Sequence, residues 1–333
     1  MTKGGDNLSK VNDLKQMNEQ MIRECFYDGN VWTKNILSEV TGLSLGSVTN
    51  ILQELLKREE IFFVGEDDST GGRKSKRYLI NKDYYHILKV VLRRTADYFE
   101  FRLRTVDLLN QVIYEKEEKT QIGSVEELIE LIQDMIVIDS FISIICMSIP
   151  GICRDGIIDV CDFKSFENLN LKQILTKEFS KDVVLENDVN IASIGFYHHY
   201  EEYKHLVFVY QPAVEYVGCG IIIDGKLYNG FTHFAGELRY LPFYNHEKQD
   251  EMLKKNPLEL LEKQIGTLCC TINPEVIGIY SDVVKNLNDL KLSSIPDIHK
   301  PQMVFVEDFY KMIETGIYQI SLKNILEREG RKR

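Results

Sequence analysis

Two short amphipathic segments joined by a glycine turn constrain the N-terminal fold of this 333-residue chain more than any other feature. Thr33 can cap a first short helix, Gly42 can supply the left-handed turn, and Ser44 can cap the helix that follows. A longer helical pattern, from Val11 to Phe26, precedes both. The second helix after the turn places its apolar side chains on one face: Val48, Ile51, Leu52, Leu55 and Leu56. This order of elements predicts a helix-turn-helix.

The other face of that second helix is polar near its start. Its polar side chains are those of Ser44, Ser47, Thr49, Asn50 and Gln53. In a helix-turn-helix the first residues of the second helix enter the major groove and contact base edges. We therefore expect these five residues to read a double-stranded DNA operator.

Two strands and a basic run follow the helices. The segments Ile61–Val64 and Arg77–Ile80 have the composition of strands, and residues 65–72 between them are polar and glycine-rich. The basic residues at the second strand are Arg73, Lys74, Lys76 and Arg77. This pattern predicts the wing of a winged helix, with cations that pair with DNA phosphates or reach the minor groove. Each signal also has a simpler explanation, a helical hairpin or a charged strand edge, and it is their order that favours DNA binding.

The distribution of charge agrees with a separate DNA-binding segment. The chain has a net charge of −11, but residues 1–82 hold twelve basic and twelve acidic residues, whereas residues 83–333 hold 28 and 39. An acidic body repels DNA phosphates, so only the neutral N-terminal segment with its local basic run can bind DNA.

Several features indicate a cytoplasmic protein. The first residues lack the apolar core of a signal peptide, and the most apolar stretch, residues 135–152, is interrupted by Asp139 and Pro150. The seven cysteines form no C-x-x-C pair, which suits free thiols in a reducing compartment. We expect no association with a membrane.

The pattern after Asn81 changes to alternating strands and helices. Strands are predicted at residues 88–92, 98–105, 111–116, 141–148 and 183–186, with a helix at 125–137 and another beginning near Asp188. A similar run starts with strands at residues 207–210 and 218–223. Such a repeat predicts an α/β fold of two lobes around a cleft.

Three segments of this body, SIPGICRDGIID, ENDVNIASIG and GCGIIIDGKLYNGFTHFAGEL, resemble the corresponding segments of the ROK family of repressors, open reading frames and sugar kinases. The N-terminal segments GLSLGSVTNILQEL and GGRKSKRYLIN resemble the repressor branch, so that the resemblance covers most of residues 10–240. It implies a winged helix-turn-helix domain at residues 1–82, fused to a two-lobed, actin-like ATPase (ribonuclease H-like) sugar-kinase fold. The implied lobes are residues 83–197 and 198–308, the second with a role in oligomerisation, and a C-terminal helix at 309–330 packs back on the first lobe. The resemblance also implies a homodimer or homotetramer and a response to a sugar or sugar derivative.

The phosphate-binding segments of the family kinases are altered in this chain. Leu92–Ala96 stands where those kinases have D-x-G-G-T, Val214–Tyr216 stands where they have G-T-G, and Glu307-Asp308 replaces a glycine pair. Glycines at such loops allow backbone N–H groups to approach phosphates closely, and the anionic Glu215 opposes a polyanion further. We therefore expect no ATP or other cofactor, no catalytic residue and no enzymatic activity.

The zinc site of the family is altered as well. Tyr240 stands where the resemblance expects a histidine ligand, and no cysteine lies between Cys219 and Cys269. Cys269 and Cys270 are adjacent and cannot easily bind one ion together. We expect no structural metal.

The sugar pocket is the part of the kinase site that the resemblance leaves in place. It assigns contacts with sugar hydroxyls to Asn168, Asn187, Asp188 and Glu237, and Tyr240 changes the pocket wall. Carboxylates and amides are suited to fixing a polyol in a cleft. Simpler roles stay open at this point: Asn187 or Asp188 as a helix cap, Asn168 as a loop residue, and Glu237 in a salt bridge.

Together these features predict a transcription regulator of carbohydrate metabolism genes whose kinase-like body senses a sugar or related metabolite. The alternatives are a sugar kinase with an attached DNA-binding domain, a DNA-binding scaffold without a ligand, and a regulator that responds to a protein partner.

Overall fold

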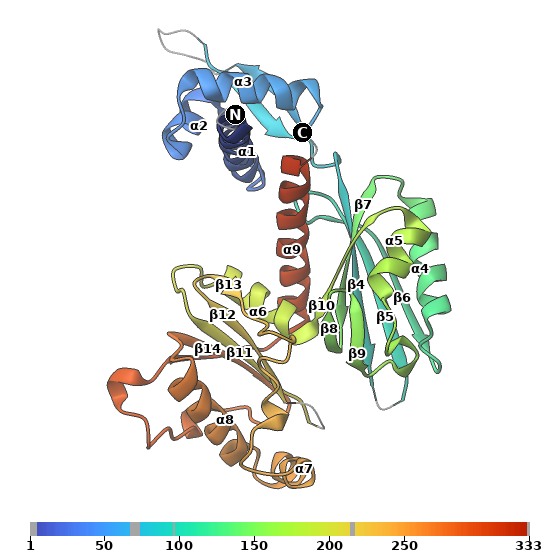
Figure 1. Ribbon diagram of the computed structural model, residues 1–333, viewed down its shortest axis with the longest axis vertical. Coiled ribbons are helices and arrows are strands. Elements are labelled where there is room, and N and C mark those ends of the chain that lie inside the picture. The colour runs from blue at the N-terminus through green and yellow to red at the C-terminus, as the bar shows by residue number, and fades with distance from the viewer. Residues whose placement is uncertain (1–4, 67–73, 96, 214–216, 332–333) are drawn as a thin grey trace.

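The computed structural model describes residues 5–66, 74–95, 97–213 and 217–331, with side chains described between residues 14 and 328. Three sets of elements are arranged along one long C-terminal helix (Figure 1). Arg73, Ala96 and the segment 214–216 lie outside the described residues, so the predictions that fall on them are not addressed by the structure.

The N-terminal set, which we call the head, contains α1 (Gly5–Phe26), β1 (Trp32–Thr33), α2 (Lys34–Thr41), α3 (Leu45–Lys57), β2 (Ile61–Glu66) and β3 (Lys76–Ile80). The expected caps are confirmed. The Thr33 side chain accepts a hydrogen bond from the Ile36 N–H, Gly42 has φ 70°, and the Ser44 side chain accepts from the Ser47 N–H. Strand β1 was not predicted from the sequence; it pairs with β3 and completes a three-stranded sheet in the order β1-β3-β2.

A buried ion-pair network holds α1 against the end of α3. The Arg23 guanidinium donates to Glu60 (2.7 Å) and Glu19 (2.6 Å), and Arg58 donates to the same two carboxylates, each at 2.8 Å. Every charge in the network has an opposite partner, which is the condition under which buried charges are tolerated. The network therefore fixes the orientation of α1 relative to α2 and α3.

The first lobe is built on a five-stranded sheet. Its elements are β4 (His86–Arg94), β5 (Phe99–Val106), β6 (Val112–Thr120), α4 (Val125–Ile138), β7 (Ile142–Ile149), β8 (Gly151–Arg154), β9 (Ile157–Cys161), α5 (Leu171–Phe179) and β10 (Asp182–Asn187). The sheet order is β10-β7-β4-β5-β6, in which β10, β7 and β4 are parallel and β5 is antiparallel to both of its neighbours, β4 and β6.

The second lobe repeats this strand order. Its elements are α6 (Asp188–His198), β11 (Leu206–Gln211), β12 (Gly218–Ile223), β13 (Lys226–Leu227), α7 (His246–Lys255), α8 (Pro257–Thr271), β14 (Val276–Ser281) and β15 (Gln302–Phe305). The sheet order is β13-β12-β11-β14-β15. As in the first lobe, three neighbouring strands (β13, β12 and β11) pair in antiparallel fashion, and the other two (β14 and β15) continue the sheet parallel to β11. The two-lobed α/β pattern predicted from the sequence is thus present as two sheets of equal topology.

Two helices join the lobes by a close crossing. The helix α6 follows β10, and α9 (Phe309–Arg331) follows β15. A Cβ atom on Gly195 of α6 would lie 1.9 Å from the Met312 carbonyl oxygen, and one on Gly316 of α9 would lie 2.0 Å from the Ile191 carbonyl oxygen. Glycine on both helices lets their backbones approach at this point.

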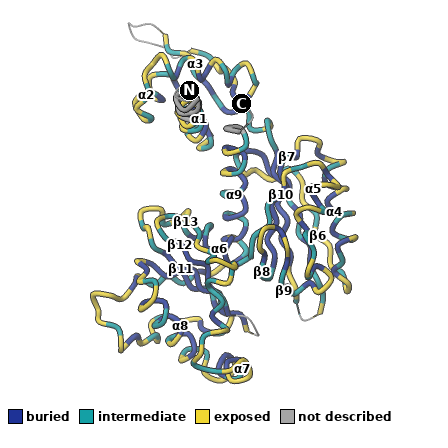
Figure 2. The backbone as a smooth tube through the Cα atoms, in the orientation of Figure 1, coloured by how far each residue is buried: buried dark blue, intermediate teal, exposed yellow. Residues whose placement is uncertain are grey.

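The head rests on the first lobe and on the end of α9. One apolar cluster contains Ile22, Leu52 and Ile80 of the head together with Leu322 and Ile325 of α9. Figure 2 shows α9, with buried residues along its length, running from the lobes toward the head. A shared core of this kind holds the head against the body by packing as well as by the connecting chain.

The lengths of the apolar helices and the state of the cysteines are two further features of the fold. No helix within the described ranges combines the length and the apolar character that a bilayer span requires. All seven cysteines are free; Cys270 is exposed, Cys25 is partly exposed, and the other five are buried.

Candidate functional site

A cavity of about 490 Å³ lies between the two lobes, at the ends of their parallel strands. The first lobe contributes the end of β4 and the turn after β7. The second contributes the start of α6, residues near the ends of β11 and β14, and the loop before Glu237. The carboxyl ends of parallel strands are where open α/β sheets bind ligands. Phe309, Tyr310 and Ile313 of α9 complete the wall.

Acidic side chains line the middle of this cavity. Asp162 follows β9, Asp188 begins α6, and Glu237 comes from the second lobe. Burial raises the pKa of Asp188 to about 7, and the neighbouring carboxylates of Asp162 and Glu237 raise it as well. Burial also raises the pKa of Glu237. Carboxylates in such a setting gain from a ligand whose hydroxyl groups donate hydrogen bonds to them.

Asn187 has a structural role that explains its position. Its side-chain oxygen accepts from the backbone N–H groups of Val189 (2.9 Å) and Asn190 (3.0 Å), so it caps α6. Its amide nitrogen donates to the carbonyl of Gly151 (2.9 Å). The cap interpretation left open by the sequence is therefore correct, and Asn187 also reaches the cavity wall.

The loop that carries Glu237 is fixed by Gly236. This glycine has φ 97°, and a Cβ atom there would lie 1.9 Å from the carbonyl oxygen of Cys219 in β12. Tyr240 lines the cavity too, and its ring lies 4.9 Å from both the Phe234 and His246 rings. Glu237 forms no ion pair with any described residue, in contrast to the salt-bridge alternative.

The structure does not bring Asn168 to this cavity. Asn168 is exposed, has φ 62°, and donates its backbone N–H to the carbonyl of Ile158 (2.7 Å). Asp162, which the sequence analysis missed, takes a place in the wall, because its backbone N–H donates to the carbonyl of Pro150 (3.1 Å) at the end of β7. One sequence signal could have indicated Asp162. It is a carboxylate directly after the strand β9, whose partner strand β8 begins at the Pro150-Gly151 turn.

A polar network across the two lobes was also missed. The Glu186 carboxylate accepts from the Asn190 amide (3.0 Å) and from the Asn229 amide of the second lobe (3.3 Å). The Asn190 amide also donates to the Asn229 side-chain oxygen (3.3 Å). Glu186 and Asn190 line the cavity, so this network joins the two walls beside the acidic side chains.

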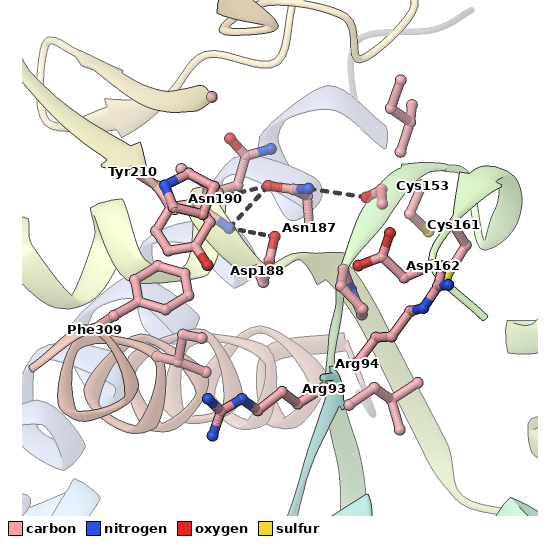
Figure 3. Close-up of a pocket in the computed structure, with 18 of the residues that line it drawn as sticks. Arg93, Arg94, Cys153, Cys161, Asp162, Asn187, Asp188, Asn190, Tyr210 and Phe309 are labelled. Atoms are coloured by element: carbon pink, nitrogen blue, oxygen red, sulfur yellow. Dashed lines mark hydrogen bonds between the residues drawn. The ribbon is translucent and has the colours of Figure 1, made fainter. Parts of the chain in front are cut away.

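Arginines occupy the segment where family kinases have their first phosphate loop. Arg93 and Arg94 end β4 and line the cavity. The Arg93 guanidinium lies 4.8 Å from the Tyr310 ring centroid and 3.7 Å from the Glu100 carboxylate. In Figure 3, Arg94 lies on the side of Asp162. The second phosphate-loop position, 214–216, is outside the described residues, and Asp308, at the altered glycine pair, accepts from the Lys311 N–H at the start of α9 (3.0 Å).

Stacked aromatic rings fill the opposite side of the cavity. The Tyr210 ring of β11 lies 4.3 Å from the Phe309 ring of α9 and 5.7 Å from the Tyr280 ring of β14. Tyr210 and Phe309 lie across Asp188 from Arg94 in Figure 3. The cavity thus has an acidic middle, an aromatic side and a cationic side.

The surface of the head carries the residues expected to contact DNA. Asn50 and Gln53 of α3 are exposed. The Ser44 and Ser47 hydroxyls lie 2.9 Å apart at the start of the helix, and the Thr49 hydroxyl donates to the Leu45 carbonyl (2.6 Å). Helix α3 thus presents a polar face at its N-terminal end.

Basic side chains lie on the neighbouring strand β3. Lys74 and Lys76 are exposed, and Arg77 is half-buried. The Lys76 ammonium lies 5.7 Å from the Phe63 ring centroid of the partner strand β2. Arg73, the remaining member of the basic run, belongs to the part of the chain that is not described.

No group of three or more His, Cys, Asp or Glu side chains in the described parts of the chain is placed to hold a metal ion. Cys269 is buried on α8 and Cys270 is exposed, so the two adjacent thiols face different environments.

Comparison with known sequences gives a consistent set of relatives. A xylose repressor of Caldicellulosiruptor bescii is 28% identical over 236 residues, which cover 68% of this chain and 58% of that protein. A xylose repressor of Bacillus spizizenii is 25% identical over 291 residues, covering 83% of this chain and 74% of that protein. The DNA-binding transcriptional dual regulator NagC of Escherichia coli is 25% identical over 260 residues, covering 72% and 61%. The chain thus spans less than two thirds of the length of the first and third of these relatives.

Solved structures share the fold. A ROK family transcriptional regulator, described as a homologue of the E. coli MLC protein, superposes with a TM-score of 0.72 at 15% identity, covering 96% of this chain and 99% of that chain. A ROK family glucokinase from Streptomyces griseus, in complex with glucose and AMPPNP, superposes with a TM-score of 0.53 at 12% identity, covering 70% and 98%. The mixed α/β fold is therefore that of ROK structures, regulators and kinases alike. Residues 99–249 match the ROK family itself, and this chain therefore carries a ROK family domain.

Proposed function

We propose that this protein is a cytoplasmic, DNA-binding transcription regulator of the ROK type that controls genes of carbohydrate metabolism. The observation that carries the proposal is the exposed polar start of α3 beside the basic strand β3, on a head attached to an acidic body. The head has the order of a winged helix-turn-helix, with α3 as the recognition helix and β2–β3 as the wing. Asn50 and Gln53 are the side chains best placed to contact base edges.

Phosphate contacts come from the wing. Lys74, Lys76 and Arg77 supply positive charge along β3, and Arg73 extends the run in the sequence. Such contacts position the head on the duplex, while the polar face of α3 selects the site. Two copies of the chain, as a homodimer or within a homotetramer, would place two heads on half-sites separated by whole turns of the DNA.

The cavity is the proposed sensor. Asp162, Asp188 and Glu237 offer carboxylate acceptors, Asn187 and Tyr240 add polar groups, and the aromatic side offers a flat apolar surface. A neutral monosaccharide or a derivative has the matching hydroxyl donors and apolar ring faces. The xylose repressors described above and a further relative, the N-acetylglucosamine repressor of Escherichia coli O6:H1, nominate D-xylose and N-acetyl-D-glucosamine as the first two probes.

Phosphoryl transfer is not part of the proposal. Asp188, with its raised pKa, would suit a general base for a sugar hydroxyl, but a kinase also needs loops that hold the phosphates. At the first such loop the chain has Arg93 and Arg94, and the Tyr210 and Phe309 rings stack between the lobes. These features support a sensing role without catalysis.

The test is selection of an operator from genomic DNA, followed by affinity measurements over a range of salt concentrations. The double variant Lys74→Gln/Lys76→Gln should bind the operator less tightly. It should also reduce the magnitude of the slope of log affinity against log salt by about 1.8, because each lost phosphate contact means that about 0.9 fewer counterions are released on binding. The matched control is Lys226→Gln/Lys254→Gln, which removes two exposed lysines of the second lobe and should leave the slope unchanged. An unchanged slope in the β3 variant would show that the wing does not lie on DNA.

A further inference from the structure

The helix α9 begins at the cavity and is attached there to the second lobe. Its first residues, Phe309, Tyr310 and Ile313, line the cavity. The Phe309 ring stacks on Tyr210 at 4.3 Å and lies 5.6 Å from the Tyr280 ring, so three rings tie the helix start to β11 and β14. A ligand that changes the separation of the lobes must act on this contact.

The middle of α9 is fastened to the first lobe. Glu314 accepts from Arg104 of β5 (3.2 Å) and from Lys89 of β4 (3.4 Å). Lys89 is 3% exposed, and its ammonium also donates to the Asn110 side chain (2.6 Å). Directly after this point Gly316 makes the close crossing with α6, the helix that begins with the cavity residue Asp188.

The last turns of α9 lie in the core of the head. The Tyr318 hydroxyl donates to the carbonyl of Leu108 (2.8 Å), in the β5–β6 turn on which the head rests. Leu322 and Ile325 belong to the same apolar cluster as Phe26 and Leu55. A small pocket of about 20 Å³ lies beside Ile325 at this junction.

An α-helix is stiff along its axis, and the 23 residues of α9 span roughly 34 Å at 1.5 Å per residue. A displacement of its first turn therefore reaches its last turns by tilting the helix about the contacts at Glu314 and Gly316. Shifts of one or two ångströms in packed helices are a common means by which ligand binding changes a distant interface.

From these contacts we propose that α9 couples the cavity to the head: occupation of the cavity displaces the Phe309 end, and the Leu322–Ile325 end changes how the head is held on the first lobe. The inference rests on the proposed sensing role of the cavity. It adds the path of the signal and the residues at its two ends.

The chain contains one tryptophan, Trp32, and this residue lies in the head, partly buried against the cluster that includes Leu322. Its fluorescence therefore reports on the head, while the titrated sugar binds between the lobes. With D-xylose or N-acetyl-D-glucosamine as the probe, binding measured by calorimetry should be accompanied by a shift of Trp32 emission. In Leu322→Ala the sugar-induced shift should fall at least fivefold, with the dissociation constant of the sugar within twofold of the parent.

The control for this measurement is Leu175→Ala, an equally conservative truncation in α5, on the side of the first lobe away from the head. It should keep both the affinity and the emission shift. Sugar binding that leaves Trp32 unchanged in the parent protein would overturn the coupling while leaving the sensing function intact. The absence of any binding heat with a panel of monosaccharides would instead contradict the proposed sensing function.

A second measurement needs neither sugar nor DNA. In Phe309→Leu the ring stack at the cavity end is removed, and backbone amide exchange should rise at least threefold in residues 45–57 and 318–326, far from the substitution. The control Phe179→Leu, at the end of α5, should leave those segments within experimental error. An increase confined to the strands and helix turn around Phe309 would show that the two ends of α9 are independent and would overturn the proposal.

Discussion

The two lobes share one strand order but differ in what they support. The first sheet has long strands of nine, eight and nine residues in β4, β5 and β6, whereas β13 and β15 of the second have two and four. In the first lobe α5 precedes the last strand, while the corresponding connection of the second contains only the short 3-10 turns Leu287–Asp289 and Asp297–His299. The same topology thus provides a broad platform in one lobe and a smaller, more irregular unit in the other.

This difference matches their positions. In Figure 1 the head lies above the first lobe and the end of α9, and the second lobe lies beside the start of α9. Lys82 of the chain that leaves the head pairs with the buried Asp107 of the first lobe (2.9 Å). The comparison shows that the head is held by the first lobe and the end of α9, whereas the second lobe meets α9 at its start, beside the cavity.

The largest effect is expected at the crossing of α6 and α9, where the two lobes meet. Gly195→Ala would place a methyl group against the Met312 carbonyl, and should cost about 2–3 kcal/mol of unfolding free energy through overpacking. The matched control is Gly266→Ala in α8, where a Cβ meets no atom within 4 Å, and where alanine should stabilise by about 0.5–1 kcal/mol. Urea unfolding distinguishes the two, and equal behaviour would mean that the lobes are not joined tightly at Gly195.

The next effect concerns the two walls of the cavity. Glu237→Ala in the second lobe and Asp162→Ala in the first should each weaken sugar binding by about 10- to 100-fold, the loss expected for a hydrogen bond to a charged group. Operator affinity without sugar should stay within twofold, and Glu247→Ala, an exposed residue of α7, should change neither quantity. Loss in only one of the two variants would restrict the binding surface to that lobe.

A smaller effect is expected from pH. The pKa of Asp188 is raised from 3.8 to about 7, so its carboxyl group is largely protonated at pH 6 and ionised at pH 8. Because the ionised form accepts hydroxyl groups best, sugar affinity should rise by up to about tenfold across this range. The raised pKa also means that the contribution of Asp188 to stability falls as the pH rises from about 4 to about 7. In Asp188→Asn calorimetric titrations should give a flat pH profile, and a rising profile would assign the dependence to another group.

The smallest effect is expected at the contact that holds α9 on the first lobe. Tyr318→Phe removes the hydrogen bond to the Leu108 carbonyl and should lower the unfolding free energy by about 1 kcal/mol. The control Tyr228→Phe changes an exposed ring of the second lobe and should be neutral. If both variants unfold alike in urea, the hydroxyl does not help to hold α9 on the first lobe.

Local patterns in the sequence predicted most of the elements. The caps at Thr33 and Ser44 and the glycine at position 42 were read correctly, because capping and left-handed turns depend on residues close in the chain. The strands with long apolar runs, β4, β7 and β11, were also located. Strand β1, only two residues long, and the β8–β9 hairpin were missed, since their pairing depends on partners that a short segment does not reveal.

The cavity was harder to predict than the fold. Asp188 and Glu237 were expected in the wall and lie there, but Asn168 lies elsewhere and Asp162 was overlooked. The two residues are six positions apart and are separated by the 3-10 turn at Lys164–Phe166, after which Asn168 is exposed. The Glu186–Asn190–Asn229 network joins residues of different lobes, and such pairs follow from tertiary structure alone.

The distribution of the unpaired thiols has a practical consequence. Cys270 is the one exposed cysteine, and it lies at the end of α8 on the second lobe, whereas Trp32 lies in the head. A thiol-reactive energy acceptor attached at Cys270 would pair with the indole as donor, without any substitution in the chain. The chain thus carries a fluorescence donor in its head and a labelling site for an acceptor in its second lobe. Energy transfer between them can follow the relative movement of the two parts in real time.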